Sequence, residues 1–479
     1  MPTFIHRLLP LPLMLLAACT LAPDYRRPAA PVPAAYPGAG PAAGTGKPLG
    51  AELGWREFLH DARLQGLVEL ALRNNRDLRV AVLNVQAARA QYGIERAALF
   101  PAVSGTAMAA RGHGSLSTYE PGAATGNIYE AYLSASWELD FFGRVRSLEK
   151  AALEQYLATE QSRTAAQLLL VAEVANQYLT VLAAEESLTV TDVSLRIAED
   201  AYRLTKLMFE TGTGSELDLR EAEGALEQAR AQRAAEERTR AQAQNALQLL
   251  VGAPLPPDLP PGLPLESQDL ASDIPAGLPS DLVERRPDIV AAEDALIAAN
   301  ANIGAARAAF FPVISLTGTA GAISPVLSQL FQSGNRTWAV SPSGTVPIFN
   351  AGLNSANLDY AKAQRDIAVA NYEKAIQTAF REVADGLVAR SSYDAQVAAL
   401  DRLVAAQQRR FELAKLRYKT GVDSYLTLLT AQTDLNTAQL SRVSASLDRL
   451  NNLVTLYQSL GGGWKERGEA VPVVGTGNP

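Results

Sequence analysis

The chain has 479 residues, a formal net charge of −7 and a single cysteine, so a basic nucleic-acid-binding surface and an internal disulfide are both excluded. Apolar residues make up 48% of the chain, which is ordinary for a folded protein and excludes a largely disordered one. Beyond the N-terminus, no run of about 18 uninterrupted apolar residues predicts a membrane-spanning helix.

The first 18 residues have the features of an export signal. Arg7 supplies a positive charge, a mostly apolar stretch follows, and Leu16-Ala17-Ala18-Cys19 resembles a bacterial lipobox. We therefore predict a signal peptide at 1–18 and a lipid on Cys19; an ordinary signal peptide with a chance cysteine is the alternative. Thr20 stands where an aspartate would favour retention in the inner membrane, so the outer membrane is expected.

An N-terminal tether and two helices come next. Residues 19–60 begin with a stretch rich in proline, alanine and glycine, which cannot bury a core and should be extended. Asp61 is a plausible N-cap for a helix whose apolar residues recur at helical spacing. A second helix is expected from about Asp77 to Ala98, and Pro101 follows its end.

Two strand-like segments follow, at about 101–110 and 128–139. In the second segment, the residues that face one way from Tyr129 to Leu139 are apolar or aromatic, and the residues between them are mainly polar. This period of two is typical of a strand with one apolar face, and about 11 residues is the length that a tilted membrane strand needs.

A long helical hairpin completes the first predicted repeat, at 61–252. From Ser147 to Glu210 the chain has neither proline nor glycine, and 64 helical residues would extend about 96 Å. A tight turn at 211–215, which contains Gly212, leads to a second helix that ends at Gly252. Helices of this length and alanine content must pack as coiled-coil pairs, because a lone one would be mostly solvated.

The same plan returns after a proline-rich linker at 253–280. The second predicted repeat, 281–461, has a helix, strand-like segments at about 312–320 and 337–347, and a long helix interrupted only by Gly386. A turn at 420–424, which contains Gly421, leads to a last helix, and 462–479 form a C-terminal tail. Gly212 and Gly421 are 209 residues apart, which indicates a gene duplication.

Four strands are too few to close a membrane barrel, because the smallest such barrels have about eight. An open sheet edge in lipid would leave backbone groups unpaired at a cost of several kcal/mol each. If these strands enter a bilayer, the chain must therefore oligomerise. Two copies would supply eight strands and three would supply twelve, and this argument does not choose between them. The predicted fold class is α+β, mainly α, with internal duplication.

No residues with catalytic or cofactor-binding spacing are found. The histidines, His6, His60 and His113, lie far apart, so no metal-ligand cluster is indicated. The glycines of 211–215 lack the lysine and the preceding strand of a phosphate-binding loop. We therefore expect a passive protein that is not an enzyme and has no cofactor.

The chain resembles the TolC-like outer-membrane factors, specifically the NodT/OprM-type lipoprotein branch that serves drug efflux. The resemblance spans nearly the whole mature chain and is carried by Cys19 to Pro28, Trp55, Arg285-Arg286-Pro287-Asp288, the two Phe-Pro joints at Pro101 and Pro312, and Tyr418 to Leu429. It implies a homotrimer with a twelve-stranded outer-membrane barrel, a periplasmic α-barrel and an equatorial belt. The implied partners are a periplasmic adaptor (membrane fusion) protein and an inner-membrane pump of the RND type.

The resemblance also places a periplasmic gate at the two turns that contain Gly212 and Gly421. Leu426 matches a position where family members narrow the pore, and Asp423 matches an acidic residue of the turn. Members often carry aspartate where this chain has Thr430, and Asp434, one turn later, is a candidate substitute. The alternatives are interhelix packing for Leu426, local hydrogen bonding for Asp423 and a solvated carboxylate for Asp434.

The expected function is the exit duct of a tripartite efflux system for small molecules such as drugs. Two alternatives stay open. One is the outer-membrane duct of a type I protein secretion system. The other is a periplasmic coiled-coil adaptor lipoprotein, but adaptors usually carry one hairpin and this chain has two.

Overall fold

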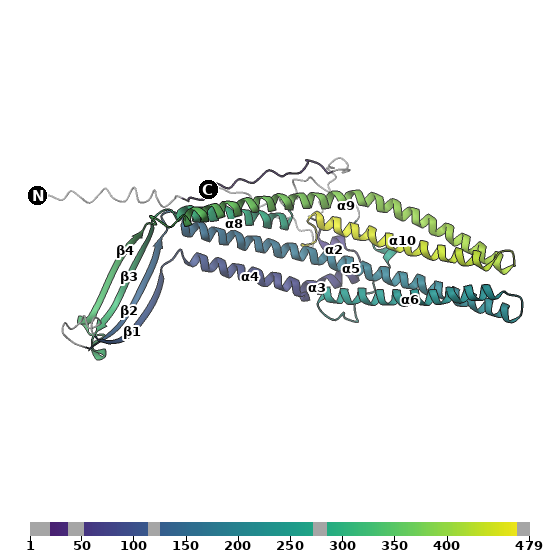
Figure 1. Ribbon diagram of the computed structural model, residues 1–479, viewed down its shortest axis with the longest axis horizontal. Coiled ribbons are helices and arrows are strands. Elements are labelled where there is room, and N and C mark those ends of the chain that lie inside the picture. Colours follow the sequence, from purple (N-terminus) through teal and green to yellow (C-terminus); the bar gives the residue numbers. More distant parts are fainter. Residues whose placement is uncertain (1–19, 37–51, 114–124, 272–284, 467–479) are drawn as a thin grey trace. The chain divides into compact units, whose positions relative to one another are not determined.

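The computed structural model describes residues 20–36, 52–113, 125–271 and 285–466 (Figure 1). The predicted signal peptide, Cys19 and most of the C-terminal tail lie outside these residues. In chain order, the helices and strands are α2 (Trp55–Phe58), α3 (Ala62–Asn74), α4 (Arg76–Ala97), β1 (Ala102–His113), β2 (Thr125–Leu139), α5 (Arg144–Glu210), α6 (Glu216–Val251), η3 (Leu265–Ser267), α8 (Pro287–Ala308), β3 (Val313–Ser324), η4 (Leu327–Gln329), η5 (Ser333–Asn335), β4 (Arg336–Thr345), α9 (Leu353–Lys419) and α10 (Tyr425–Ser459).

The described chain forms two compact units, and each takes residues from both repeats. The sheet unit comprises the described residues of Met1–Ala29, Leu83–Glu160 and Ala291–Glu373. The hairpin unit comprises those of Ala30–Val82, Gln161–Val290 and Lys374–Pro479. Helices α5 and α9 contribute to both, because each is one unbroken helix of 67 residues.

The sheet unit contains one antiparallel sheet in the order β1-β2-β3-β4. The central pairing joins the two repeats: β2 of the first lies beside β3 of the second, with Leu133 opposite Ala320 and Trp137 opposite Leu316. Strands β1 and β4 are the outer strands, and each has one neighbour among the described strands.

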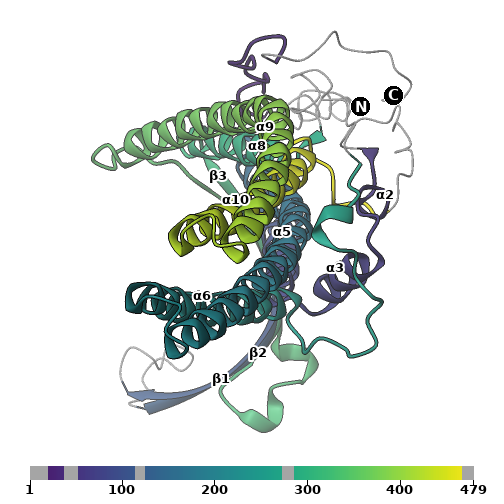
Figure 2. The ribbon, with the colours of Figure 1, turned by 90° about the vertical axis from the view of Figure 1, so that its right-hand side faces the viewer.

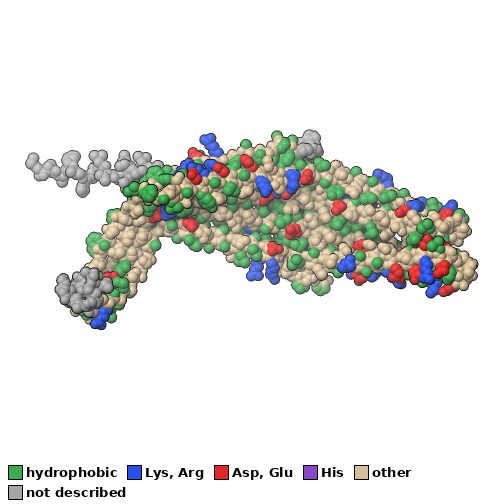
Figure 3. All heavy atoms as spheres, in the orientation of Figure 1, with side chains coloured by type: hydrophobic (Ala, Val, Ile, Leu, Met, Phe, Trp, Pro, Cys, Tyr) green, Lys and Arg blue, Asp and Glu red, His purple; other side chains and the backbone are tan. Residues whose placement is uncertain are grey.

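The two faces of the sheet differ in chemistry, as the alternation predicts. Register places Leu133 beside Ala320 and Ala320 beside Trp338, so these apolar residues share one face. Leu133 and Trp338 are 61% and 79% exposed, so the described residues leave this face without cover. The other face carries Ser134, Thr319 and Ala339 in register, with hydroxyl side chains along most of its length. Charged side chains are sparse along the strands (Figure 3).

The N-terminal segment is extended as expected, but it is not a loose tether. Within the sheet unit, the Tyr25 hydroxyl and the Arg27 Nε donate to Oε1 of Glu293 on α8 over 2.8 and 2.7 Å. Asn300 and Arg307 of α8 donate to backbone carbonyls of the same segment. Composition could not reveal these bonds, because each joins residues more than 260 positions apart.

The hairpin unit contains both turns and the helices that flank them (Figures 1 and 2). In the first hairpin, Arg233 of α6 pairs with Asp192 of α5 over 2.7 Å. In the second, α9 passes through Gly386 without a break, so the expected interruption there was wrong. A Cβ atom at Gly386 would lie 3.1 Å from Leu456 of α10, so glycine permits close approach of the two helices.

Each repeat fixes the end of its hairpin by a related contact. Arg286 and Asn75 are counterparts, 211 residues apart. The Asn75 amide donates to the Leu250 carbonyl near the end of α6, and the Arg286 guanidinium donates to the Ser459 carbonyl at the end of α10, both over 2.9 Å. Arg286 also binds Asp288 (2.6 and 3.0 Å) and Glu382 (2.9 Å), although its own side chain is only 10% exposed.

One described helix, α5, contains an 18-residue window apolar enough to cross a membrane by length and composition, although the sequence predicted no such helix. Half of that window is buried within the chain. Alanine and leucine packed against neighbouring helices account for this hydropathy, as in the core helix of a helical bundle.

Asp61, the predicted N-cap, is a buried polar anchor of the hairpin unit. It accepts hydrogen bonds from the backbone of Arg63 (2.8 Å) and Leu263 (2.9 Å) and from the side chains of Tyr178 (2.9 Å) and Gln268 (2.7 Å). Burial opposes the charge, but these donors outweigh it and hold the pKa of Asp61 below its ordinary value of 3.8.

Asp61→Asn is expected to lower the free energy of unfolding at neutral pH by about 1–3 kcal/mol, because an amide cannot accept all these bonds. A lowered folded-state pKa gives stability above pH 3.8 that is lost as the pH falls through the lowered pKa. Denaturant unfolding between about pH 3 and pH 7 should therefore show a weaker acid dependence in the variant. The exposed Asp258→Asn is the control, and equal curves for both variants would contradict the prediction.

Candidate functional site

The two turns of the hairpin unit are built alike. Gly212 and Gly421 both adopt positive φ angles, 74° and 71°, which favour glycine. Gly212 donates to the Phe209 carbonyl and Gly421 to the Tyr418 carbonyl, both over 3.0 Å. The sequence therefore located both turns correctly, and the αL glycine that ends each long helix is the reason.

Ser215 begins the helix that follows the first turn. Its hydroxyl accepts from the Asp218 backbone over 3.1 Å, as an N-cap does. Ser424 holds the equivalent position 209 residues later, but its hydroxyl lies 3.3 Å from that of Thr427 and caps no backbone N–H. Charged side chains of both signs gather at this end of the hairpins (Figure 3).

Asp423 forms a fork-to-fork ion pair across the second turn. Arg417 donates through Nε (2.6 Å) and Nη2 (3.0 Å) to the two carboxylate oxygens. Hydrogen bonding from Arg417 lowers the pKa of Asp423, so this carboxylate is ionised at neutral pH. The sequence interpretation missed Arg417, whose position six residues before Asp423 places it across the turn.

The other candidate residues occupy the first turns of α10. Leu426 is 56% exposed, whereas its neighbour Tyr425 is 2% exposed and belongs to the core. The Thr430 hydroxyl donates to the Leu426 carbonyl over 2.8 Å, so it is occupied within its own helix. Asp434 pairs with Arg410 of α9 over 2.5 Å, so it is not simply a solvated carboxylate.

A small core behind the turns holds the two hairpins together. It is formed by buried residues of α6, α9 and α10 with partly buried residues of α5: Ala222, Phe411, Ala414, Tyr425, Leu428, Ala431, Leu435, Ile197, Ala201 and Tyr202. Burial raises the pKa of the Tyr425 hydroxyl to about 12, which keeps it neutral. Leu426, one residue away, points out of this core and is free for another role.

Polar contacts further along the hairpins also join the two repeats. Arg442 of α10 binds Asp401 of α9 (2.7 Å), Glu266 of η3 (2.6 Å) and Glu186 of α5 (3.4 Å). The Ser194 hydroxyl of α5 bonds the Asn436 amide oxygen over 2.9 Å. Movement of the second hairpin away from the first must break the Arg442–Glu186 and Ser194–Asn436 contacts, whereas the Arg442–Asp401 pair lies within the second hairpin.

Comparison with known proteins decides which class these features belong to. The family model for outer membrane efflux proteins matches residues 67–253 and again 278–462. The chain belongs to the outer membrane efflux protein family. The two matches coincide with the two repeats and confirm the internal duplication.

The relatives are efflux proteins of the outer membrane. The chain is 48% identical over 458 residues to the antibiotic efflux pump outer membrane protein ArpC of Pseudomonas putida. This alignment covers 95% of this chain and 94% of that protein. It is 46% identical over 463 residues to the toluene efflux pump outer membrane protein TtgI of P. putida. That alignment covers 94% of this chain and 97% of TtgI. The open-state structure of the MtrE outer membrane channel of Neisseria gonorrhoeae has a TM-score of 0.86, with 42% identity over 94% of this chain and 100% of that one.

These findings confirm the expected TolC-like fold, the outer-membrane location and the efflux function. The protein is an outer-membrane efflux channel. Relatives of this kind are channels and not enzymes, which fits the expectation of a protein without catalysis. In the described residues, no group of three or more His, Cys, Asp or Glu side chains could hold a metal ion.

Proposed function

We propose that three copies of this outer membrane efflux protein form one duct, which passes small apolar molecules such as antibiotics or solvents to the exterior. The main support for this proposal is the four-stranded sheet. It has two free outer strands and one apolar face without cover, so one copy cannot satisfy its backbone in lipid. Three such sheets make twelve strands, enough for a closed barrel.

The comparison between α4 and α8 supports assembly of this kind. Helix α8 buries Ile289, Leu296 and Ile303, whereas only Leu78 is buried on α4, its counterpart in the first repeat. Apolar side chains on α4 are left exposed: Val80, Val82, Leu83 and Ile94. Contact with a second copy would remove these exposed apolar side chains from water.

The proposed partners follow from this assembly. The duct receives substrates from a periplasmic adaptor protein and an inner-membrane pump of the RND type. A lipid on Cys19 anchors the N-terminus in the outer membrane, and the packed segment from Thr20 onward joins that anchor to α8. Labelling of wild type but not Cys19→Ser with radioactive palmitate would test the anchor.

Planar-bilayer recording and native mass spectrometry of the detergent-extracted protein test the duct. A mass of three chains and discrete conductance steps are expected. A water-soluble single chain without conductance would contradict the proposal. Loss of antibiotic export on deletion, with no change in exported proteins, would distinguish small-molecule efflux from type I protein secretion.

The gate is proposed at the second turn. Three Leu426 side chains would narrow the duct, while the Arg417–Asp423 and Arg410–Asp434 pairs hold the turn and the first part of α10 in place. Because each aspartate has an arginine partner, a ring of Asp423 or Asp434 would carry less net charge than unpaired carboxylates. Gly212 and Gly421 set the two turns at this tip through their positive φ angles.

Leu426→Ala is expected to raise single-channel conductance, because truncation at an exposed position widens a constriction without opening a core cavity. Leu217, 68% exposed, is the counterpart in the first turn and provides the control Leu217→Ala. Both variants should assemble in wild-type yield. Equal conductance in wild type and Leu426→Ala would remove Leu426 from the gate.

A further inference from the structure

A second site lies in the hairpin unit, where α3 meets α4 beside α5. It is a cavity of about 480 Å³. It is lined by Leu72, Arg73, Asn74, Asn75, Arg76, Leu78, Arg79, Val82, Arg163 and Gln167. Four of these side chains are arginines and none is a carboxylate, although the chain as a whole is acidic.

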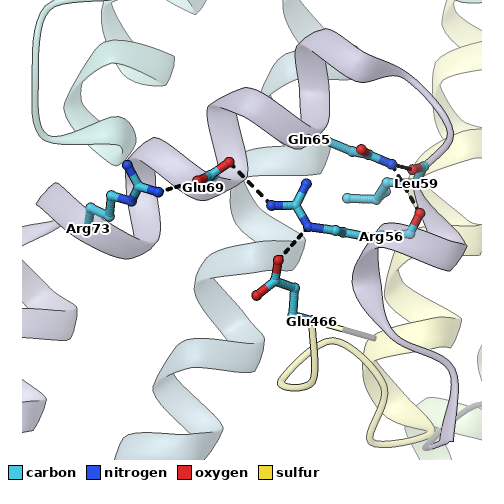
Figure 4. A network of polar contacts seen from close by, with 6 residues as sticks. All are labelled: Arg56, Leu59, Gln65, Glu69, Arg73 and Glu466. Atoms are coloured by element: carbon cyan, nitrogen blue, oxygen red, sulfur yellow. Dashed lines mark hydrogen bonds and ion pairs between the residues drawn. The ribbon is translucent and has the colours of Figure 1, made fainter. Parts of the chain in front are cut away.

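Most of this positive charge has no anionic partner within the part of the chain that the structure describes. Arg73 pairs with Glu69, which also binds Arg56, so this carboxylate is already shared between two cations (Figure 4). Among the described residues, no ion pair involves Arg76, Arg79 or Arg163. The Arg163 guanidinium contacts only neutral groups, the Gln167 amide oxygen at 3.4 Å and the Thr164 hydroxyl at 3.3 Å.

The backbone also contributes positive electrostatic potential at this cavity. Arg76 is the first residue of the 22-residue helix α4, so the positive end of the helix dipole lies at the cavity. Asp77, also in this first turn, is exposed and does not line the cavity. Glu173 on α5 is likewise exposed and does not line the cavity.

The other repeat shows what the equivalent surface can hold. Arg163 corresponds to Tyr372, 209 residues later, and Val82 to Glu293, 211 residues later. In the second repeat this surface is covered: Tyr372 is fully buried, and Glu293 binds Arg27 and Tyr25 of the N-terminal segment. At the counterpart positions the first repeat has Arg163 in place of the tyrosine and Val82 in place of the glutamate, so an acidic residue is lost and a basic one is gained.

We propose that this cavity is an anion-binding site for a ligand that carries at least two carboxylate or phosphate groups. Guanidinium groups bind both kinds of oxyanion through paired N–H donors. A volume of about 480 Å³ lies in the range of small-molecule sites and exceeds the space that one phosphate needs. The gate and its residues play no part in this site.

Isothermal titration of the detergent-extracted, assembled protein tests the site, with pyrophosphate and citrate as separate probes. Wild type should bind at least one probe, with an affinity that falls steeply as salt rises. The double variant Arg79→Gln/Arg163→Gln should bind about tenfold more weakly or worse. Preference for pyrophosphate would indicate a phosphorylated ligand, and preference for citrate a carboxylated one.

A matched control variant removes two positive charges from positions outside the cavity. Arg89→Gln/Arg238→Gln changes two arginines that lie outside the cavity, one on α4 and one on α6, and should bind like wild type. Thermal unfolding of both variants checks that neither has lost its fold. No binding by wild type, or equal weakening in both double variants, would overturn the proposal.

Discussion

Arg286→Ala is expected to lower the free energy of unfolding by about 2–3 kcal/mol, because the guanidinium is buried but the side chains of Asp288 and Glu382 that lose it are 44% and 35% exposed. The guanidinium satisfies Asp288, Glu382 and the Ser459 carbonyl at once. Its removal leaves Asp288 and Glu382 without this cation and the Ser459 carbonyl without this donor. The midpoint and slope of denaturant unfolding would measure this loss.

Arg285→Ala is the control in the neighbouring position. Arg285 is more exposed and makes one described ion pair, with Glu52 over 2.7 Å, so its loss should cost about 0–1 kcal/mol. Arg286→Lys should recover only part of the stability, because an ammonium group cannot reproduce the fork to Asp288. Similar midpoints for the two alanine variants would show that the Arg286 network contributes little.

Gly321→Val is expected to prevent formation of the intact sheet and therefore of the channel. A Cβ atom at residue 321 would lie 2.5 Å from the Cα atom of Tyr132 and would overlap the Ala131 carbonyl oxygen. Both obstacles are backbone of β2, which cannot move without breaking the β2–β3 ladder. The cost should exceed the about 1–3 kcal/mol of ordinary overpacking.

Gly318→Val tests whether this effect depends on position. Gly318 lies on the same strand, and a Cβ atom there would meet nothing within 4 Å. Wild type and Gly318→Val should give heat-resistant assemblies on electrophoresis and normal yields in the outer membrane, and Gly321→Val should give neither. Normal assembly of Gly321→Val would show that the pairing of β2 with β3 is more adaptable than the backbone indicates.

The repeated architecture was predictable because its signals are local or periodic. Alternation from Tyr129 to Leu139 fixed the faces of β2, and Gly212 and Gly421 marked both turns. Strand ends were predicted less accurately: β1, β2 and β3 each extend three or four residues further than predicted. The alternation of apolar and polar residues weakens near a strand end, where the strand extends beyond the apolar surroundings that require one apolar face.

Contacts between distant helices were not predictable. Asp434 was a candidate for an unpaired gate carboxylate, but Arg410 binds it from α9. Arg442 binds carboxylates from three elements, and Arg27 binds Glu293, which lies 266 positions away in the sequence. Such pairs depend on the rotation of each helix about its axis, which a single sequence pattern does not specify.

The matched lengths of the two hairpins restrict how such a chain can change over time. Helices α5 and α9 have 67 residues each, and α6 and α10 have 36 and 35. One inserted residue would advance everything beyond it by about 1.5 Å and turn it by about 100° about the helix axis. Substitutions can therefore accumulate along these rods, whereas insertions and deletions should be confined to the connections between strands.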